Sequence, residues 1–341
     1  MKKILFATTV LVATASMAAA EVRISGYGRF GLDYNDFNAR TGLNGAGVAA
    51  NGVSETNITS RLRLQFDMST ETDGGVTLGA RFRAQAESRD NAPGGAIFNG
   101  ARFYATYGGF TLGVGNIIGA FENASGLYLE TRTAGTGIDG QGFVDNVANV
   151  SNEAFNWDAY SSAGAGVNGF EVLYSAGAFQ GHISYSTTNG APAAQVDRVA
   201  VNVAYTFGDW TVALAAQDSD RLFEDKTFAS VQGKIGAFGV RLAYADNEGI
   251  GKLGLYGNMD IGAASNILVW VTSEDDVSAA DIAAGRANNT TTIAAGGTGS
   301  AGTSYGIHYS YDLGGGASFE AGLSEHANDQ TQVQAGVYFS F

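Results

Sequence analysis

Residues 58–68, with the sequence ITSRLRLQFDM, decide the fold of this chain. Apolar side chains stand at every second position from Leu62 to Met68, and the polar positions that alternate with them are Thr59, Arg61, Arg63, Gln65 and Asp67. Successive side chains of a β-strand point to opposite faces, so the stretch predicts a strand with one apolar and one polar face. Strands of soluble sandwiches show the same alternation but are typically ~5 or 6 residues long. This run reaches the ~9 to 11 residues that a tilted strand needs to cross a bilayer.

The alternation recurs from Glu21 to the end of the chain. It predicts about sixteen strands in one antiparallel barrel, because bacterial single-chain barrels have even strand numbers. The expected strands lie near 21–34, 58–69, 76–87, 97–107, 110–116, 169–175, 179–187, 197–207, 210–218, 227–235, 240–246, 252–260, 266–274, 304–311, 318–325 and 330–341. Residues 154–161 resemble a further strand but are assigned to a loop to keep the number even. A barrel needs all of its strands, so residues 21–341 are expected to form a single domain.

The connections alternate between short and long. Short ones are expected at 71–75, 108–109, 175–178, 208–209, 236–239, 260–265 and 312–317, and long ones at 35–57, 116–168 and 275–303. Short periplasmic turns opposite longer external loops are typical of transmembrane barrels. Aromatic residues such as Tyr107, Phe207 and Trp210 stand beside the short turns, where they would suit the boundary between bilayer and water.

Residues 1–20 are predicted to be a cleaved signal peptide. Lys2 and Lys3 precede an apolar run over 4–15, and Ala18 and Ala20 supply the small residues of a cleavage site, so the mature chain should begin at Glu21. Loss of the two lysines would take the net charge from −14 to −16. An acidic chain of this kind excludes nucleic acid as a partner, because duplex binding requires clustered basic residues.

The composition favours long strands over helices and disulfides. The chain has 49 glycines, two prolines and no cysteine, so its stability must come from hydrogen-bonded strands rather than from covalent bridges. The last strand, VQAGVYFSF at 333–341, alternates in the same way and ends on an aromatic residue.

This order of features resembles the general porins, most closely the sixteen-stranded trimeric porins of photosynthetic and related alphaproteobacteria. The most specific stretches are EVRISG at 21–26, SRLR at 60–63, YSAGAF at 174–179, AYTFG at 204–208 and YDLGGGAS at 311–318. The resemblance implies a homotrimer in the outer membrane, surrounded by lipid and lipopolysaccharide, through which ions and small hydrophilic solutes diffuse. It also implies that Gly336, Phe339 and Phe341 form the signal read by the barrel-assembly machinery. A substrate-specific channel, for example for sugars, and a soluble secreted lectin remain as alternatives.

The resemblance further implies a constriction, formed where the third external loop folds into the lumen. Its acidic residues would be Glu122, Glu130 and Asp139, and the facing basic wall would be Arg29, Arg61, Arg63, Arg81 and Arg83. These arginines all lie at polar positions of the first three strands. The alternative is that Asp33, Asp67 and Glu87 neutralise them locally.

No residues point to covalent chemistry, and no enzymatic activity is expected. His182 and His308 have no metal-ligating partners at useful spacing and are interpreted as wall residues of the lumen. No cofactor is expected. Acidic external loops could hold Ca²⁺, but nothing in the sequence locates a site, since Ca²⁺ requires six to eight converging oxygens.

Overall fold

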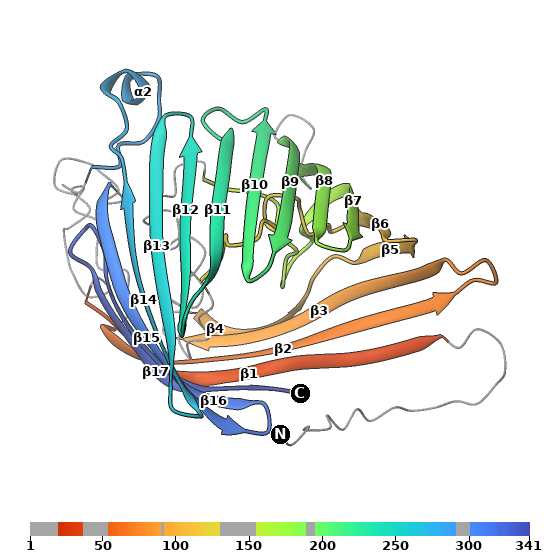
Figure 1. The fold of residues 1–341 in the computed structure, drawn as a ribbon, viewed down its shortest axis with the longest axis horizontal. Helices are drawn as coiled ribbons and strands as arrows, with labels where there is room; N and C mark the ends of the chain where they lie inside the picture. Colours follow the sequence, from red (N-terminus) through yellow and green to blue (C-terminus); the bar gives the residue numbers. More distant parts are fainter. Residues whose placement is uncertain (1–19, 37–53, 90–91, 130–154, 189–194, 291–300) are drawn as a thin grey trace.

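The chain forms a closed antiparallel β-barrel in the computed structural model, which describes residues 20–36, 54–89, 92–129, 155–188, 195–290 and 301–341 (Figure 1). One continuous sheet of 17 labelled strands follows sequence order, and the pairing of β1 with both β2 and β17 closes it. Two of the labelled strands, β4 and β5, pair with successive parts of β3 and together occupy one position in the wall. The barrel therefore has sixteen wall positions, as the sequence predicts.

The bounds of the elements agree with the predicted strands to within a few residues, apart from the earlier start of the fourth. They are β1 (Glu21–Asn35), β2 (Thr56–Glu71), β3 (Thr77–Arg89), β4 (Ala92–Phe98), β5 (Arg102–Tyr107), β6 (Phe110–Gly115), β7 (Val167–Ala176), β8 (Phe179–Thr188), β9 (Asp197–Phe207), β10 (Trp210–Ser219), β11 (Lys226–Ile235), β12 (Phe238–Asn247), β13 (Ile250–Ile261), β14 (Ser265–Glu274), α2 (Ala279–Ala283), β15 (Gly302–Gly314), β16 (Ala317–Glu325) and β17 (Thr331–Ser340). Residues 155–161 form no strand, as expected.

The break between β4 and β5 lies at residues 99–101, and the sequence did not predict it. Asn99 still exchanges hydrogen bonds with Arg83 of β3, but its side-chain amide donates to the carbonyl oxygen of Ser161 at 2.5 Å. Asn99 also forms an isolated bridge with Gly164. The wall is therefore interrupted where the long connection between β6 and β7 attaches to it.

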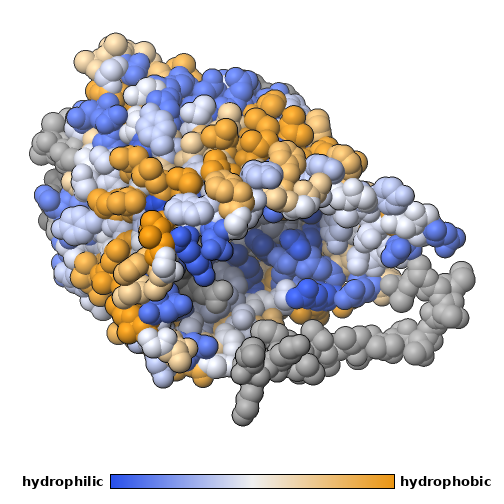
Figure 2. All heavy atoms as spheres, in the orientation of Figure 1, coloured by the Kyte–Doolittle hydropathy of each residue, from blue (hydrophilic) through white to orange (hydrophobic). Residues whose placement is uncertain are grey.

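The two faces of the wall differ as the alternation predicts. On β9, Val199, Val201 and Val203 are exposed, whereas Ala200 and Asn202 between them are buried. Figure 2 shows hydrophobic residues over the outer surface and hydrophilic ones in the hollowed centre of the molecule. Among the described residues, no helix is long and apolar enough to cross a membrane. The strands present the apolar face that lipid requires, and the polar face lines the lumen.

Strand ends at one side of the barrel are joined by tight turns. Gly108 and Gly109 link β5 to β6 with φ values of +56° and +86°, a backbone conformation that favours glycine and suits a two-residue hairpin. Most connections at the opposite ends, such as the one between β6 and β7, are longer, and the two-residue turn between β12 and β13 is the exception. This confirms the predicted asymmetry of short and long connections.

The seam between the first and last strands ends on aromatic side chains. Gly26 and Phe341 exchange two backbone hydrogen bonds of 2.9 and 3.0 Å. The ring of Phe341 lies against Gly26, and the ring of Phe339 lies against Gly28, where an added Cβ would come within 2.3 Å of it. Both glycines thus leave space that the terminal aromatic rings fill.

Candidate functional site

The described parts of the connection between β6 and β7, residues 116–129 and 155–166, fold against the inner wall of the barrel. We call residues 117–129 its outgoing limb and residues 155–162 its return limb. Five strands between β7 and β12 each supply a polar side chain that bonds the backbone of the outgoing limb; these are Glu171 of β7, Ser184 of β8, Asn202 of β9, Ser230 of β11 and Arg241 of β12. The loop thus follows the wall from β7 to β12, which confirms that it lies inside the lumen.

The first of these anchors is a fully buried carboxylate. Glu171 accepts hydrogen bonds from the backbone N–H groups of Ile118 at 3.0 Å and Gly119 at 3.2 Å. Its other oxygen accepts from Nε of Arg102 at 2.5 Å, and Nε2 of His182 lies 3.0 Å from the carboxylate. Burying a carboxylate is costly unless it is paired and hydrogen-bonded, and here four donors meet that requirement.

An apolar cluster holds the middle of the loop. Phe121 and Leu127 are buried together with Phe155 of the return limb, against lumen-facing alanines of the wall. These alanines are Ala200, Ala215, Ala243 and Ala245. Small side chains at inward positions of β9, β10 and β12 leave the room that the loop's aromatic rings occupy.

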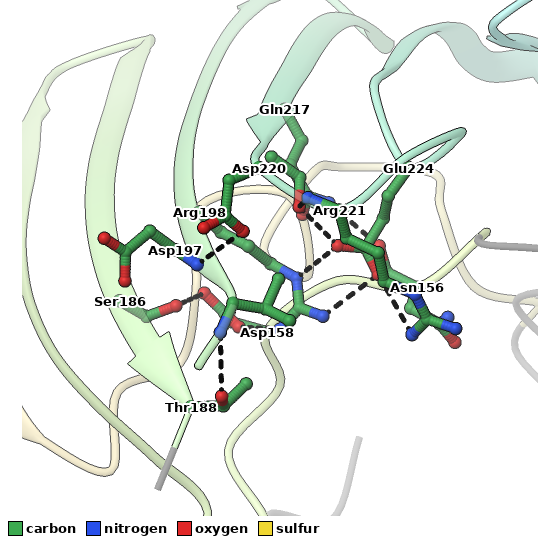
Figure 3. Close-up of polar contacts among 12 residues, drawn as sticks. Asn156, Asp158, Ser186, Thr188, Asp197, Arg198, Gln217, Asp220, Arg221 and Glu224 are labelled. Carbon is green, nitrogen blue, oxygen red and sulfur yellow. Dashed lines mark hydrogen bonds and ion pairs between the residues drawn. The ribbon is translucent and has the colours of Figure 1, made fainter. Parts of the chain in front are cut away.

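The return limb is anchored to the same wall by ionic contacts (Figure 3). Asp158 accepts a hydrogen bond from the Ser186 hydroxyl and forms an ion pair of 3.1 Å with Arg198 of β9. Arg198 in turn donates two hydrogen bonds, of 2.8 and 3.0 Å, to the buried carboxylate of Glu224. The carbonyl oxygen of Asn156 accepts from Lys226 at 2.6 Å. Both limbs are therefore attached to the wall formed by β7–β12.

Beyond Asp158 the return limb reaches the part of the wall formed by β3. The Tyr160 hydroxyl donates to the carbonyl oxygen of Arg81 at 3.0 Å, and the guanidinium of Arg83 stacks over the Tyr160 ring at 4.6 Å. Arg83 also donates to the Ser162 hydroxyl at 3.3 Å. The loop thus crosses the lumen from the wall of β8–β11 to that of β3, and it narrows the channel between them.

The predicted basic residues lie together on the lumen side of β1, β2 and β3. Arg29 stands opposite Arg61 in the register of β1 and β2. We call the paired lumen side chains of β2 and β3 the arginine ladder; its four rungs are Arg61–Glu87 at 2.8 Å, Arg63–Gln85 at 2.8 Å, Gln65–Arg83 at 2.9 Å and Asp67–Arg81 at 2.5 Å. Arg61 and Arg81 therefore form ion pairs with carboxylates of the neighbouring strand. Asp33 accepts instead from Gln332 and Gln334.

One predicted loop acid lies near this wall. The Glu122 carboxylate accepts hydrogen bonds from the Tyr128 hydroxyl and from Nε1 of Trp157 at 2.7 Å, so it also ties the two limbs together. Burial raises the pKa of Glu122 above its ordinary value, while these hydrogen bonds and the positive charge of Arg83 act to lower it. Glu122 and Arg83 thus interact electrostatically. Glu130 and Asp139 lie outside the described residues.

Sequence reasoning missed Glu171 and the inward alanines of β9–β12. Both could have been found in the sequence, because an isolated acid at an inward position directly follows the long loop and a row of small inward residues leaves lumen space unfilled.

Among the described residues, no group of three or more His, Cys, Asp or Glu side chains could hold a metal ion. The Ca²⁺ site in the acidic loops stays a prediction. His182 and His308 pair with Glu171 and Glu320, as expected of wall residues.

Comparisons with known proteins show which proteins share this sequence and fold. A family profile described as Gram-negative porin matches residues 7–331. A porin of Fuscovulum blasticum is 30% identical over 332 residues, covering 94% of this chain and all of the relative. A porin of Rhodobacter capsulatus is 27% identical over 360 residues, with the same coverage. The solved structure of a multiply substituted porin of Rhodopseudomonas blastica matches with a TM-score of 0.72 at 25% identity, over 94% of this chain and 100% of that one.

Proposed function

Since this chain belongs to the Gram-negative porin family, we propose that it selects solutes at a constriction between the basic wall of β1–β3 and the inward-folded loop. As a porin it is a multi-pass channel of the outer membrane, through which ions and small hydrophilic solutes diffuse. The observation that carries the proposal is that the loop reaches the basic wall, where the Arg83 guanidinium lies 4.6 Å from the centre of the Tyr160 ring and donates to the Ser162 hydroxyl.

Opposite charges on the two sides of a narrow passage create a transverse field. The walls on either side have a low dielectric constant, so the charges are screened less than at an open surface. The field orders water and orients dipolar solutes, whereas an apolar solute disrupts that water without replacing its interactions. Size and polarity therefore both decide which solutes pass.

Ion selectivity is expected to be modest and in favour of cations. The predicted mature charge of −16, from −14 with Lys2 and Lys3, raises the cation concentration at the mouths. Salt screens this attraction over about 10 Å at 0.1 M, and the arginines oppose it inside the channel.

Replacing Arg61 and Arg63 together with serine tests the constriction. We expect faster passage of bulky neutral sugars, because two long side chains leave the narrow passage, and a shift of selectivity further toward cations, because positive charge is lost. Liposome swelling measures the first effect, and reversal potentials in planar bilayers measure the second.

The reverse control is Glu122→Gln, which removes negative charge from the facing loop and should shift the reversal potential toward anions. Heat-modifiable migration establishes that each variant is folded. A folded double variant that matches the parent in both assays would place the constriction elsewhere.

We also propose that the native particle is a homotrimer. Identical subunits tend to close symmetric rings, and the family resemblance implies three copies. Native mass measurement in mild detergent should find about three times the 35.2 kDa of one chain, less the signal peptides. A particle containing a single chain would contradict this.

A further inference from the structure

We propose that the centre of the arginine ladder is a binding subsite for small oxyanions of carboxylate or phosphate chemistry. The inference deepens the proposed function, since it rests on the ladder lining the lumen. It assigns to Arg63 and Arg83 a role as direct ligands, in addition to their part in the transverse field.

The rungs of the ladder differ in charge along its length. At both ends an arginine faces a carboxylate, in the pairs Arg61–Glu87 and Asp67–Arg81. The two central rungs instead join Arg63 and Arg83 to glutamine side chains. An amide oxygen accepts a hydrogen bond but carries no charge, so the centre of the ladder keeps two positive charges that the ends do not.

The two central guanidinium groups are held in place by contacts that leave their terminal nitrogens largely unused. Arg63 lies over the ring of Tyr27 at 5.0 Å, and Arg83 lies over that of Tyr160 at 4.6 Å. Each is also fixed through Nε, to Gln85 and Gln65 respectively. Within the described part of the chain, the side chain of Arg63 makes no other hydrogen bond, and Arg83 makes only the long one to Ser162.

This arrangement suits an oxyanion. The terminal nitrogens of a guanidinium form a planar fork that matches the oxygens of a carboxylate or phosphate, and a fork already held by stacking loses little entropy on binding. The glutamine amides in turn are oriented by the outer acids, because Gln65 donates to Asp67 at 2.8 Å and Gln85 to Glu87 at 3.3 Å. Every polar group of the centre is therefore positioned, and among the described residues neither central arginine forms an ion pair with a carboxylate of the strands.

Binding would change the channel's own selectivity. A bound phosphate dianion would cancel the two central charges, so the remaining lumen would favour cations more strongly. The experiment measures the reversal potential in a KCl gradient with increasing millimolar inorganic phosphate at constant ionic strength. We expect a saturating shift toward cation preference in the parent protein. A parallel titration with acetate tests whether the subsite also binds carboxylates. The reversal potential in chloride buffer without any oxyanion gives the baseline.

The decisive variant is the double substitution Gln65→Glu and Gln85→Glu, which has nearly the same shape and turns the central rungs into ion pairs. The phosphate-dependent shift should be lost although every arginine remains. The matched control, Arg61→Gln with Glu87→Gln, removes both charges of an outer rung without changing the net charge. It leaves at position 87 an amide oxygen that can still accept from Gln85, so it should keep the shift.

A second variant tests the subsite if the protein with Gln65→Glu and Gln85→Glu does not fold. Arg63→Lys with Arg83→Lys keeps both charges but removes the planar forks, so a higher phosphate concentration should be needed for half of the shift. Absence of a saturating shift in the parent, or its persistence in the folded glutamate variant, would overturn the subsite. Neither result would contradict the proposed function, because the passage of sugars and salt that tests it is measured without phosphate.

Discussion

Deleting Phe341 is expected to lower the amount of folded barrel in the outer membrane several-fold. The terminal residue closes the seam of the barrel, because its backbone N–H and carbonyl groups pair with Gly26 and its ring lies against that glycine. An aromatic ring that covers a glycine on the neighbouring strand pins the register of the pair. The same residue is the predicted recognition element for the assembly machinery, together with Gly336 and Phe339, so its loss should impair both targeting and closure.

The measurement is the quantity of heat-resistant, folded protein in isolated outer membranes. Phe341→Ala should behave like the deletion. Phe207→Ala is the matched control, since Phe207 is an aromatic residue of similar exposure, 51% against 56%, and lies beside a short turn away from the seam. Equal amounts of folded protein from the two alanine variants would show that the terminal ring has no special role.

Replacing Glu171 with glutamine is expected to loosen the constriction loop and to destabilise the barrel by about 3 to 5 kcal/mol, the usual effect of leaving one member of a buried ion pair without its partner. Arg102 is the charge left behind, with only 6% of its side chain exposed. The N–H groups of Ile118 and Gly119 would also lose their charged acceptor at the start of the outgoing limb.

A loosened loop should let larger sugars pass and should increase the fluctuation of single-channel current. Denaturant unfolding in detergent measures the stability, and planar bilayers with liposome swelling measure the passage. Glu320→Gln is the control for a merely structural effect, because Glu320 is a buried lumen acid that pairs with His308 and Ser318 and has no bond to the described limbs of the loop. If both variants leave sugar passage and current noise unchanged, Glu171 does not position the loop.

Most of the barrel could be predicted from the sequence because its signals are local. The alternation in residues 58–68 makes β2 a strand and sends Leu62 outward, and this depends only on the geometry of an extended backbone. Turn glycines such as Gly108 and Gly109 act within a few residues in the same way. For this reason the strands and the faces of the barrel wall agree with prediction.

Only the tertiary structure decided which of those arginines are neutralised. Arg61 and Arg63 stand two residues apart on the same face of one strand and are indistinguishable by pattern. The register of β2 against β3 places Glu87 opposite the first and Gln85 opposite the second, so one forms an ion pair and the other does not. The path of the long loop likewise depends on its contacts with Glu171 and the inward alanines, which lie on strands that the folded barrel brings against it. Both outcomes rest on pairings between residues distant along the chain, and a period-two pattern determines the face of a side chain but not its partner across the strands.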